Sequence, residues 1–157
     1  MEVIQNQLKI KIRRASIKDF EAVKRIEYLS FKNPYSDYYL KRLLNGNLAD
    51  LSFIAELNNQ PVGYVIARRE FKENEIIGHV IAIAVHPDFR GRGIGKRLME
   101  TVLQEFKKLG VKKVYLEVRV NNLPALRLYE KLGFKIVEYI PSYYRDGEDA
   151  FVLEKIL

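Results

Sequence analysis

Apolar and polar residues along the chain follow two periods, one typical of strands and one typical of helices. Residues 8–15 (LKIKIRRA) alternate apolar and polar side chains, which predicts a half-exposed strand. In residues 16–31 the apolar side chains recur every three or four positions, the spacing of an amphipathic helix, and Ser16 followed by Asp19 predicts its capped start. Residues 77–85 (IGHVIAIAV) form an apolar run that predicts a strand buried on both faces. The chain is therefore expected to mix strands and helices.

The same two periods predict elements along the rest of the chain in the order β-α-α-β-β-β-α-β-α-β-β. Pro34 separates the first two helices, and the residues NNQ at 58–60 predict a hairpin turn. We expect strands at 8–15, 51–57, 61–71, 77–85, 112–120, 134–140 and 150–156, and helices at 16–31, 36–46, 94–110 and 121–133. The chain shows no repeat or linker, so we predict one α/β (α+β) domain over residues 1–157, with residues 1–7 as a candidate flexible segment.

Composition excludes several kinds of chemistry. The chain has 157 residues, a net charge of +7, no cysteine and two histidines. Without cysteine there is no disulfide and no thiolate nucleophile, and two histidines argue against a metal site, so no metal is expected. The first residues lack a long apolar block, which argues against a signal peptide or a membrane span. We therefore expect a cytoplasmic protein without a membrane partner.

Residues 89–97 (FRGRGIGKR) place three glycines among four cationic side chains between a predicted strand and a predicted helix. Backbone N–H groups at a helix N-terminus bind anions, and glycine lets an anion approach them closely. A dinucleotide fingerprint fails at Lys96, and a phosphate loop of the Walker type fails at Arg90 and Arg97. The pattern that fits is Arg-x-x-Gly-x-Gly, from Arg90 to Gly95. The alternative is a tight turn that uses glycine only for its backbone freedom.

This loop, followed by YLEVRVNNLPALRLYEKLGF (115–134) and SYYRDGEDAFVLEK (142–155), resembles the GNAT superfamily of acyl-CoA-dependent N-acetyltransferases. The similarity is greatest to RimI-type ribosomal-protein alanine acetyltransferases and to related archaeal-style catalytic subunits. The resemblance implies a single domain with a mixed sheet of about seven strands flanked by about four helices. It also implies transfer of acetyl from acetyl-CoA to the α-amino group of protein N-termini, including those of ribosomal proteins, by direct attack in a ternary complex.

In that family the loop amides hold the pyrophosphate of the cofactor, and the preceding strand hydrogen-bonds its pantetheine arm. Carried over by position, the cofactor contacts are Ile83, Ala84, Val85, Arg90, Gly91, Arg92, Gly93, Ile94, Gly95 and Lys96. The N–H of Val85 is the expected donor to the oxyanion. Asn122 caps the following helix or contacts the cofactor, and these two roles are compatible.

Amide formation from a thioester requires a base for the amine and an acid for the departing thiolate. Glu117 lies within an apolar strand, and it is either the base or the salt-bridge partner of Arg119. Alternation along its strand places His79 on one face with Ile81, Ile83 and Val85. If the strands that carry His79 and Glu117 are neighbours, the two side chains could share one ordered water; otherwise His79 is a surface residue. Tyr129 resembles the tyrosine that protonates the thiolate in the family and contacts the cofactor, and its alternative role is packing in the core.

Aromatic residues on both sides of this region are suited to holding an extended peptide. The positions that resemble the peptide-binding walls of N-terminal acetyltransferases are Phe31, Pro34, Tyr35, Tyr143 and Tyr144. Some relatives carry a glutamate near the first of these walls, where this chain has Asn33, so specificity that depends on that acid is in doubt. Small first residues such as Ser or Ala are the expected substrates, and Met also fits because Asn33 is uncharged.

Two other classes of function compete with this interpretation. The first is a GNAT enzyme that acetylates a small amine or a lysine, whose pKa of about 10.4 demands a stronger base than the α-amine value of about 8. The second is a non-catalytic module that binds CoA or nucleic acid. Most tyrosines fall in predicted loops and helices and not among basic residues on strands, which argues against nucleic acid. Oligomeric state and the need for an auxiliary subunit stay open.

Overall fold

A computed structural model describes residues 9–157, and its element order is the one predicted from periodicity. The seven strands form one sheet in the order β1-β2-β3-β4-β5-β7-β6. The strands are β1 (Ile10–Arg14), β2 (Leu51–Leu57), β3 (Gln60–Lys72), β4 (Glu75–Val85), β5 (Lys113–Arg119), β6 (Lys135–Ile140) and β7 (Ala150–Ile156). The helices are α2 (Phe20–Ser30), α3 (Asp37–Leu44), α4 (Ile94–Lys108) and α5 (Leu123–Lys131), with short 3-10 turns η1 (Ile17–Asp19) and η2 (Pro87–Phe89). The candidate flexible segment 1–7 lies outside the described residues.

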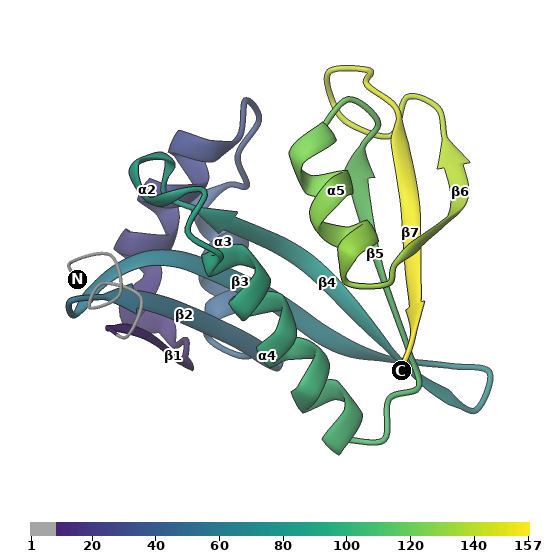
Figure 1. Cartoon of the computed structure of the whole chain (residues 1–157), viewed down its shortest axis with the longest axis horizontal. Coiled ribbons are helices and arrows are strands. Elements are labelled where there is room, and N and C mark those ends of the chain that lie inside the picture. The colour runs from purple at the N-terminus through teal and green to yellow at the C-terminus, as the bar shows by residue number, and fades with distance from the viewer. Residues whose placement is uncertain (1–8) are drawn as a thin grey trace.

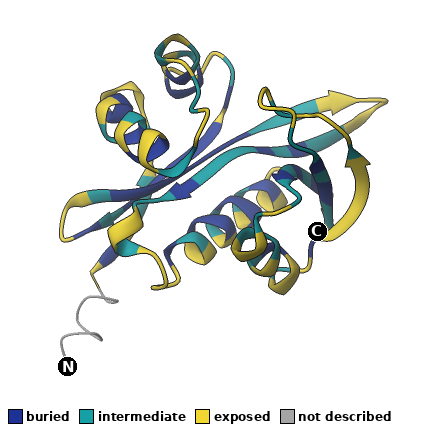
Figure 2. Ribbon diagram, turned by 90° about the horizontal axis from the view of Figure 1, so that it is seen from above, coloured by how far each residue is buried: buried dark blue, intermediate teal, exposed yellow. Residues whose placement is uncertain are grey.

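The helices cover both faces of the sheet: α2 and α3 lie on one side, and α4 and α5 lie on the other (Figures 1 and 2). Each side has its own buried cluster. The α2/α3 side includes Val23, Ile26, Leu40, Leu43, Ile54, Tyr64 and Ile66. The α4/α5 side includes Val65, Leu98, Met99, Val102, Phe106, Val114 and Leu116. Each fully buried aliphatic side chain contributes about 1.5–3 kcal/mol, so these two clusters hold the helices on the sheet. No helix in residues 9–157 is long and apolar enough to cross a membrane.

Local chemistry at the helix ends explains where the helices begin. Ser16 and Asp19 form the expected capping box, but the box closes the 3-10 turn η1, and the α-helix proper begins at Phe20. Ser36 caps α3 by accepting from the N–H of Tyr39. The N-cap of α4 is a glycine, so that helix begins without a side-chain cap.

The β3–β4 hairpin is longer than the sequence pattern predicts. Residues 72–76 (KENEI), predicted as a loose stretch, instead continue both strands and turn at Glu73 and Asn74, whose φ angles are +49° and +67°. Two successive residues with positive φ match the right-handed twist of a hairpin, which is why the strands stay paired to their ends. The extension brings Glu70 and Lys72 of β3 beside the start of β4.

The sheet divides between β4 and β5. These strands are parallel and pair through three residues each, 77–79 with 113–115. Beyond this point they diverge, and Figure 1 shows the sheet opening like a V between β4 and β5. In the described structure, residues 80–85 of β4 therefore have no strand partner on the β5 side, and the backbone groups on that side can bind a ligand.

A β-bulge lies in β4 beside this opening. Val80 pairs with Ala67 and Ala82 pairs with Ile66, so Ile81 is an extra residue on β4. Side chains of Ile83 and Val85 pack on the α4/α5 side, whereas Ile81 packs on the α2/α3 side. The expectation that His79 shares a face with Ile83 and Val85 is therefore wrong, because the bulge turns the strand over between them. His79 instead faces Arg68 and Tyr115, its partners on the two neighbouring strands.

Candidate active site

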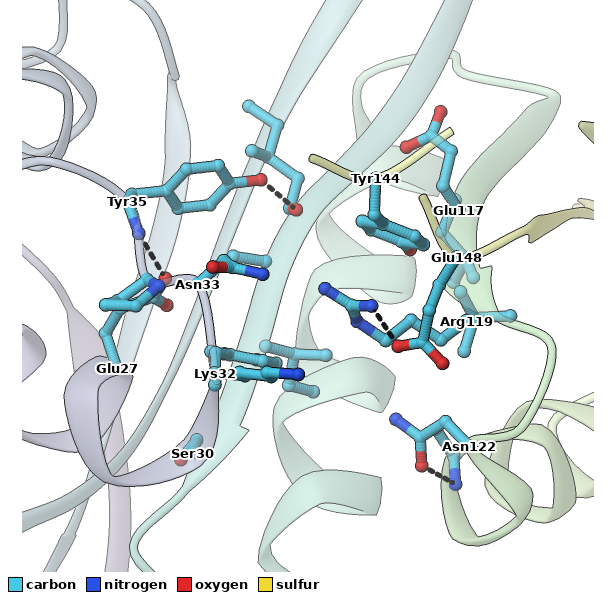
Figure 3. A pocket seen from close by; sticks show the side chains of 18 of the residues that line it. Glu27, Ser30, Lys32, Asn33, Tyr35, Glu117, Arg119, Asn122, Tyr144 and Glu148 are labelled. Atoms are coloured by element: carbon cyan, nitrogen blue, oxygen red, sulfur yellow. Dashed lines mark hydrogen bonds and ion pairs between the residues drawn. The ribbon is translucent and has the colours of Figure 1, made fainter. Parts of the chain in front are cut away.

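A cleft of about 1190 Å³ occupies the opening between β4 and β5. Its walls are the α2–α3 connection, the edge of β4, the cleft face of β5, the start of α5 and the β6–β7 loop. Nine of the predicted site residues line it: Phe31, Pro34, Tyr35, Ile83, Glu117, Asn122, Tyr129, Tyr143 and Tyr144. Figure 3 shows the two walls, with Asn33 and Tyr35 on one side facing Arg119, Tyr144 and Glu148 on the other.

The glycine loop lies beyond the end of the cleft lining, at the N-terminus of α4. Gly91 and Gly93 both have φ of +78°, a conformation that favours glycine, and Gly93 is the N-cap of α4. Because this cap has no side chain, the first N–H groups of the helix are free of a side-chain acceptor and can bind an anion. Two hydrogen bonds of the Arg90 side chain hold the loop in place. Nε donates to the Val85 carbonyl at 2.9 Å, and Nη2 donates to Ser30 Oγ at 3.1 Å.

Glu117 is held by a histidine and not by the neighbouring arginine. Residues of β5 alternate between the core and the cleft, and Glu117 points to the cleft side. Its Oε1 lies 2.8 Å from Nε2 of His79. Arg119 instead pairs with Asp146 at 3.0 Å and with Glu148. The expected ion pair of Glu117 with Arg119 is therefore absent from the described ion pairs, and Glu117 and His79 bond directly, where the sequence suggested a shared water.

A second carboxylate contacts the other nitrogen of His79, and the sequence analysis missed it. Glu70 Oε2 lies 3.0 Å from His79 Nδ1. Glu70 also accepts from Tyr115 Oη at 2.6 Å and from Arg68 Nε at 2.8 Å. Burial alone would raise the pKa of Glu70, but these hydrogen bonds and the interaction with His79 outweigh it and lower the pKa to about 2. Arg68, Glu70 and Lys72 occupy alternate positions on β3, next to the strand that carries His79. This spacing of charged residues was the signal that could have indicated the cluster.

The position of Tyr129 is compatible with both roles that the sequence left open, and the acid role stays a prediction. Its ring is 6% exposed and meets Phe134 at a centroid distance of 5.8 Å, which is core packing. It also lines the cleft. Burial raises its pKa, so the hydroxyl keeps its proton at neutral pH and can donate it. Asn122 caps α5 by accepting from Ala125 N at 3.3 Å and lines the cleft as well.

One wall of the cleft is fixed by a buried carboxylate that the sequence analysis did not single out. Glu27 is 2% exposed; it accepts from the N–H of Tyr35 at 2.9 Å and from the hydroxyl of Tyr64. Burial raises the pKa of Glu27, although both hydrogen bonds act to lower it. The hydroxyl of Tyr35 donates to the carbonyl of Ile81 at 3.4 Å, as Figure 3 shows. Hydrogen bonds of Tyr35 thus connect the α2–α3 connection to both α2 and β4.

The opposite wall is the β6–β7 loop, residues 141–149. The rings of Tyr143 and Tyr144 meet edge to face at 5.0 Å, and the Arg119 guanidinium lies 4.1 Å from the centre of the Tyr144 ring. Burial is the main cause that raises the pKa of Tyr144 to about 12. The two walls touch where Asn33 Nδ2 donates to Asp146 Oδ2 at 3.4 Å. The two aromatic walls of the cleft are therefore joined at one point.

Comparison with known proteins agrees with this geometry. Residues 20–134 match the model of the acetyltransferase (GNAT) family. A curated N-alpha-acetyltransferase of Sulfurisphaera tokodaii is 36% identical over 152 residues, which are 91% of this chain and 90% of that protein. Among solved structures, the NatC complex bound to Gag peptide and CoA contains a chain with a TM-score of 0.87 and 29% identity, covering 95% of this chain and 99% of that one. The ribosomal-protein-S18-alanine N-acetyltransferase of Escherichia coli gives a TM-score of 0.84 at 29% identity, covering 94% and 93%.

The predicted mixed seven-stranded sheet with four α-helices is therefore confirmed by the structure and by these likenesses. The match covers most of the described chain, from the first residue of α2 to the residue before β6. The chain belongs to the GNAT family of acetyltransferases.

Proposed function

We propose that the protein transfers acetyl from acetyl-CoA to the α-amino group of protein N-termini. The observation that carries the proposal is the cleft itself, which joins an open strand edge for a thioester to two aromatic walls and to Glu117, whose carboxylate contacts His79 behind the cleft lining. Relatives at 36% identity over nine-tenths of the chain are named N-alpha-acetyltransferases, which supports the same reaction here.

Acetyl-CoA fits the open edge of β4 and the N-terminus of α4. The N–H groups at Gly93 to Lys96 supply donors for the pyrophosphate, and the helix dipole favours its negative charge. The pantetheine arm would run along residues 83–85 as a substitute for the missing strand partner. In this pose the thioester would lie between β4 and β5, with the N–H of Val85 as donor to the oxyanion. Ala84 contributes only its backbone, because its side chain is buried on the α2/α3 side.

The reaction follows as direct attack within a ternary complex. The ammonium form of the N-terminus gives a proton to Glu117, which is held by His79 at 2.8 Å. The neutral nitrogen then attacks the thioester carbonyl carbon, and the negative charge on oxygen is stabilised by backbone N–H donors. When the carbon–sulfur bond breaks, Tyr129 donates its proton to the thiolate. The nitrogen, which became cationic on attack, releases its second proton, and this proton restores the Tyr129 hydroxyl through solvent. The products are a neutral amide and CoA, and the one net proton released stays on Glu117 until it passes to water.

The cleft favours an N-terminus over a lysine side chain. The wall at Phe31 to Tyr35 and the wall at Tyr143 and Tyr144 meet through Asn33 and Asp146, which leaves a slot suited to a chain with backbone on one side only. An α-amine has a pKa near about 8 and needs only a modest base. We infer substrates with small first residues such as Ser or Ala, or with Met, ribosomal proteins among them, in the cytoplasm.

The test is acetylation of a peptide library that varies the first two residues, with the modified nitrogen located by mass spectrometry. Each peptide carries one internal lysine, and a matched peptide with a blocked N-terminus is the control. We expect label on the α-nitrogen and none on the blocked control. Label on lysine with free N-termini unmodified would replace this function by lysine acetylation. Thermal stabilisation by an oligonucleotide but not by acetyl-CoA would reject both in favour of a nucleic-acid-binding module.

A further inference from the structure

Glu27, in the last turn of α2, is a buried carboxylate that the proposed reaction does not use. Asp19 and Glu27 are the two buried carboxylates of residues 9–157. Asp19 pairs with Arg13 at 2.7 Å, whereas Glu27 accepts from a backbone N–H and from a phenol. A carboxylate this far from water is stable only where hydrogen bonds replace its hydration. The donors around Glu27 therefore show which segments it holds together.

Glu27 bonds both ends of the loop at residues 31–35, which begins the α2–α3 connection. Its backbone carbonyl accepts from the N–H of Phe31 at 3.0 Å, where the helix ends. Its side-chain Oε2 accepts from the N–H of Tyr35 at 2.9 Å, as Figure 3 shows. Between these two donors lies Pro34, which has no N–H. One residue thus fixes where the chain leaves α2 and where it returns to it.

The same carboxylate places this loop relative to the sheet. Glu27 Oε1 accepts from the hydroxyl of Tyr64, a fully buried residue of β3. At the other end of the Tyr35 side chain, the hydroxyl donates to the carbonyl of Ile81 at 3.4 Å, the extra residue of the β4 bulge. The loop is therefore held at a fixed position beside the strand whose open edge faces the cleft.

The loop belongs to the peptide side of the site. Three of the side chains that resemble a peptide-binding wall lie in it and line the cleft: Phe31, Pro34 and Tyr35. The glycine loop contacts α2 through Arg90 and Ser30, before the loop at 31–35 begins. A displacement of residues 31–35 should therefore change the contacts to the peptide and leave the cofactor loop in place.

We infer that Glu27 is a positioning residue for the peptide substrate, because its bond to the N–H of Tyr35 keeps the wall at residues 31–35 in the place that peptide binding needs. This inference rests on the proposed function of the same site. Oε2 can accept this N–H whether the carboxyl is ionised or carries a proton on Oε1, since the hydroxyl of Tyr64 can turn to donate or to accept. The role of Glu27 is therefore a matter of hydrogen-bond geometry and not of charge.

The test compares Glu27→Met with Glu27→Gln. Methionine keeps an unbranched side chain but offers Tyr35 only a weak sulfur acceptor, whereas glutamine keeps an oxygen for Tyr35 and can donate to Tyr64. We expect Glu27→Met to raise the peptide KM about tenfold, with kcat and the acetyl-CoA KM within about twofold of the unmodified protein. Glu27→Gln should keep the peptide KM within about threefold. Glu27→Asp is a further variant, which withdraws the carboxylate from Tyr35 by one methylene and should also raise the peptide KM.

Hydrogen exchange of the Tyr35 amide separates this local role from a general loss of stability. Glu27→Met should make exchange at this amide about tenfold faster or more, because the N–H loses its acceptor. The matched control is Asp19→Asn, which weakens the bond to Arg13 and lies outside the described cleft lining. It should lower Tm while the peptide KM and the exchange of Tyr35 stay as in the unmodified protein.

An unchanged peptide KM in folded Glu27→Met and Glu27→Asp would overturn the inference, as would an equal rise in the acetyl-CoA KM. All variants are compared on the peptide that the unmodified enzyme acetylates fastest, so the comparison is the same whichever nitrogen takes the acetyl group. Label on lysine alone in the unmodified enzyme would instead overturn the proposed function. A rise confined to the peptide KM, with faster exchange at Tyr35, would still support the positioning role of Glu27.

Discussion

Replacing Gly95 by alanine should affect the stability of the fold and the affinity for acetyl-CoA in different ways. Gly95 is the second residue of α4, and a Cβ there would meet Leu128 Cδ2 at 3.6 Å and Val85 Cγ2 at 3.9 Å, which are ordinary contacts. A helical Cβ tilts toward the N-terminus of its helix. That is where a pyrophosphate bound to the first N–H groups would lie. The methyl group that the fold accepts should therefore obstruct the cofactor.

The substitution should raise the stability of the protein and weaken the binding of acetyl-CoA, and the size of each effect can be estimated. Alanine is favoured over glycine by up to about 1 kcal/mol inside a helix, and by less in the first turn. For a domain of this size 1 kcal/mol corresponds to a Tm increase of about 2–4 °C. Loss of one hydrogen bond to a charged phosphate costs about 1.5–3 kcal/mol, which is an increase in Kd of about 10- to 150-fold.

The assay pairs thermal unfolding of the ligand-free protein with calorimetric titration of acetyl-CoA. Gly95→Ala should keep or raise Tm and weaken the Kd. The control is Gly110→Ala at the other end of α4, where φ is +82° and nothing lies near the new Cβ. It should lower stability by about 1–2 kcal/mol through backbone strain and leave the Kd unchanged. A folded Gly95→Ala protein with normal affinity would show that the pyrophosphate does not bind at the α4 N-terminus. Gly93→Ala, with φ of +78°, should lose both stability and affinity.

Four further substitutions test the site and the packing beneath it. Glu117→Gln should lower kcat about 100-fold or more near neutral pH, with a deficit that shrinks as pH rises and the α-amine loses its own proton; a constant deficit would argue against a base. Tyr129→Phe should lower kcat by about 10- to 100-fold at unchanged Tm, because the ring keeps its contact with Phe134; normal turnover would assign Tyr129 to packing alone. Tyr144→Ala should raise the peptide KM more than the acetyl-CoA Kd, and the reverse order would move the residue to the cofactor side. Gly78→Ala would place a Cβ 2.9 Å from the buried Phe106 ring, so unfolding experiments should show a loss of about 1–3 kcal/mol, and an unchanged Tm would contradict the packing described.

The order of helices and strands was predictable because it depends on local periodicity. In α4, for example, Ile94, Leu98, Val102 and Phe106 are all buried, as their spacing indicates. The bulge at Ile81 was not predictable from the same pattern. An extra apolar residue inside an apolar run leaves both composition and run length typical of a strand, so only the register with β3 reveals it.

The positions of candidate site residues were predictable where these residues belong to local motifs: the glycine loop lies at the N-terminus of α4, and Glu117 and Tyr129 line the cleft. Their roles stay predictions. Positions that depend on contacts between distant segments were not predictable in this way. Glu70 meets His79 across a hairpin, and Glu27 meets Tyr64 from a helix 37 positions away in the chain. Single carboxylates in amphipathic segments have no distinctive spacing, so their roles become visible only when the strands and helices are placed in space.

The extra residue in β4 has a consequence for how this enzyme can change during evolution. Before the bulge the even-numbered Val80 faces the α4/α5 side of the sheet, and after it the odd-numbered Ile83 and Val85 face that side. Substitutions in this stretch leave that assignment of faces unchanged. Changes of length are different: deleting one residue between His79 and Ile83 would rotate the whole first half of the strand and turn His79 away from Glu117. Selection should therefore tolerate substitutions in this stretch but not insertions or deletions.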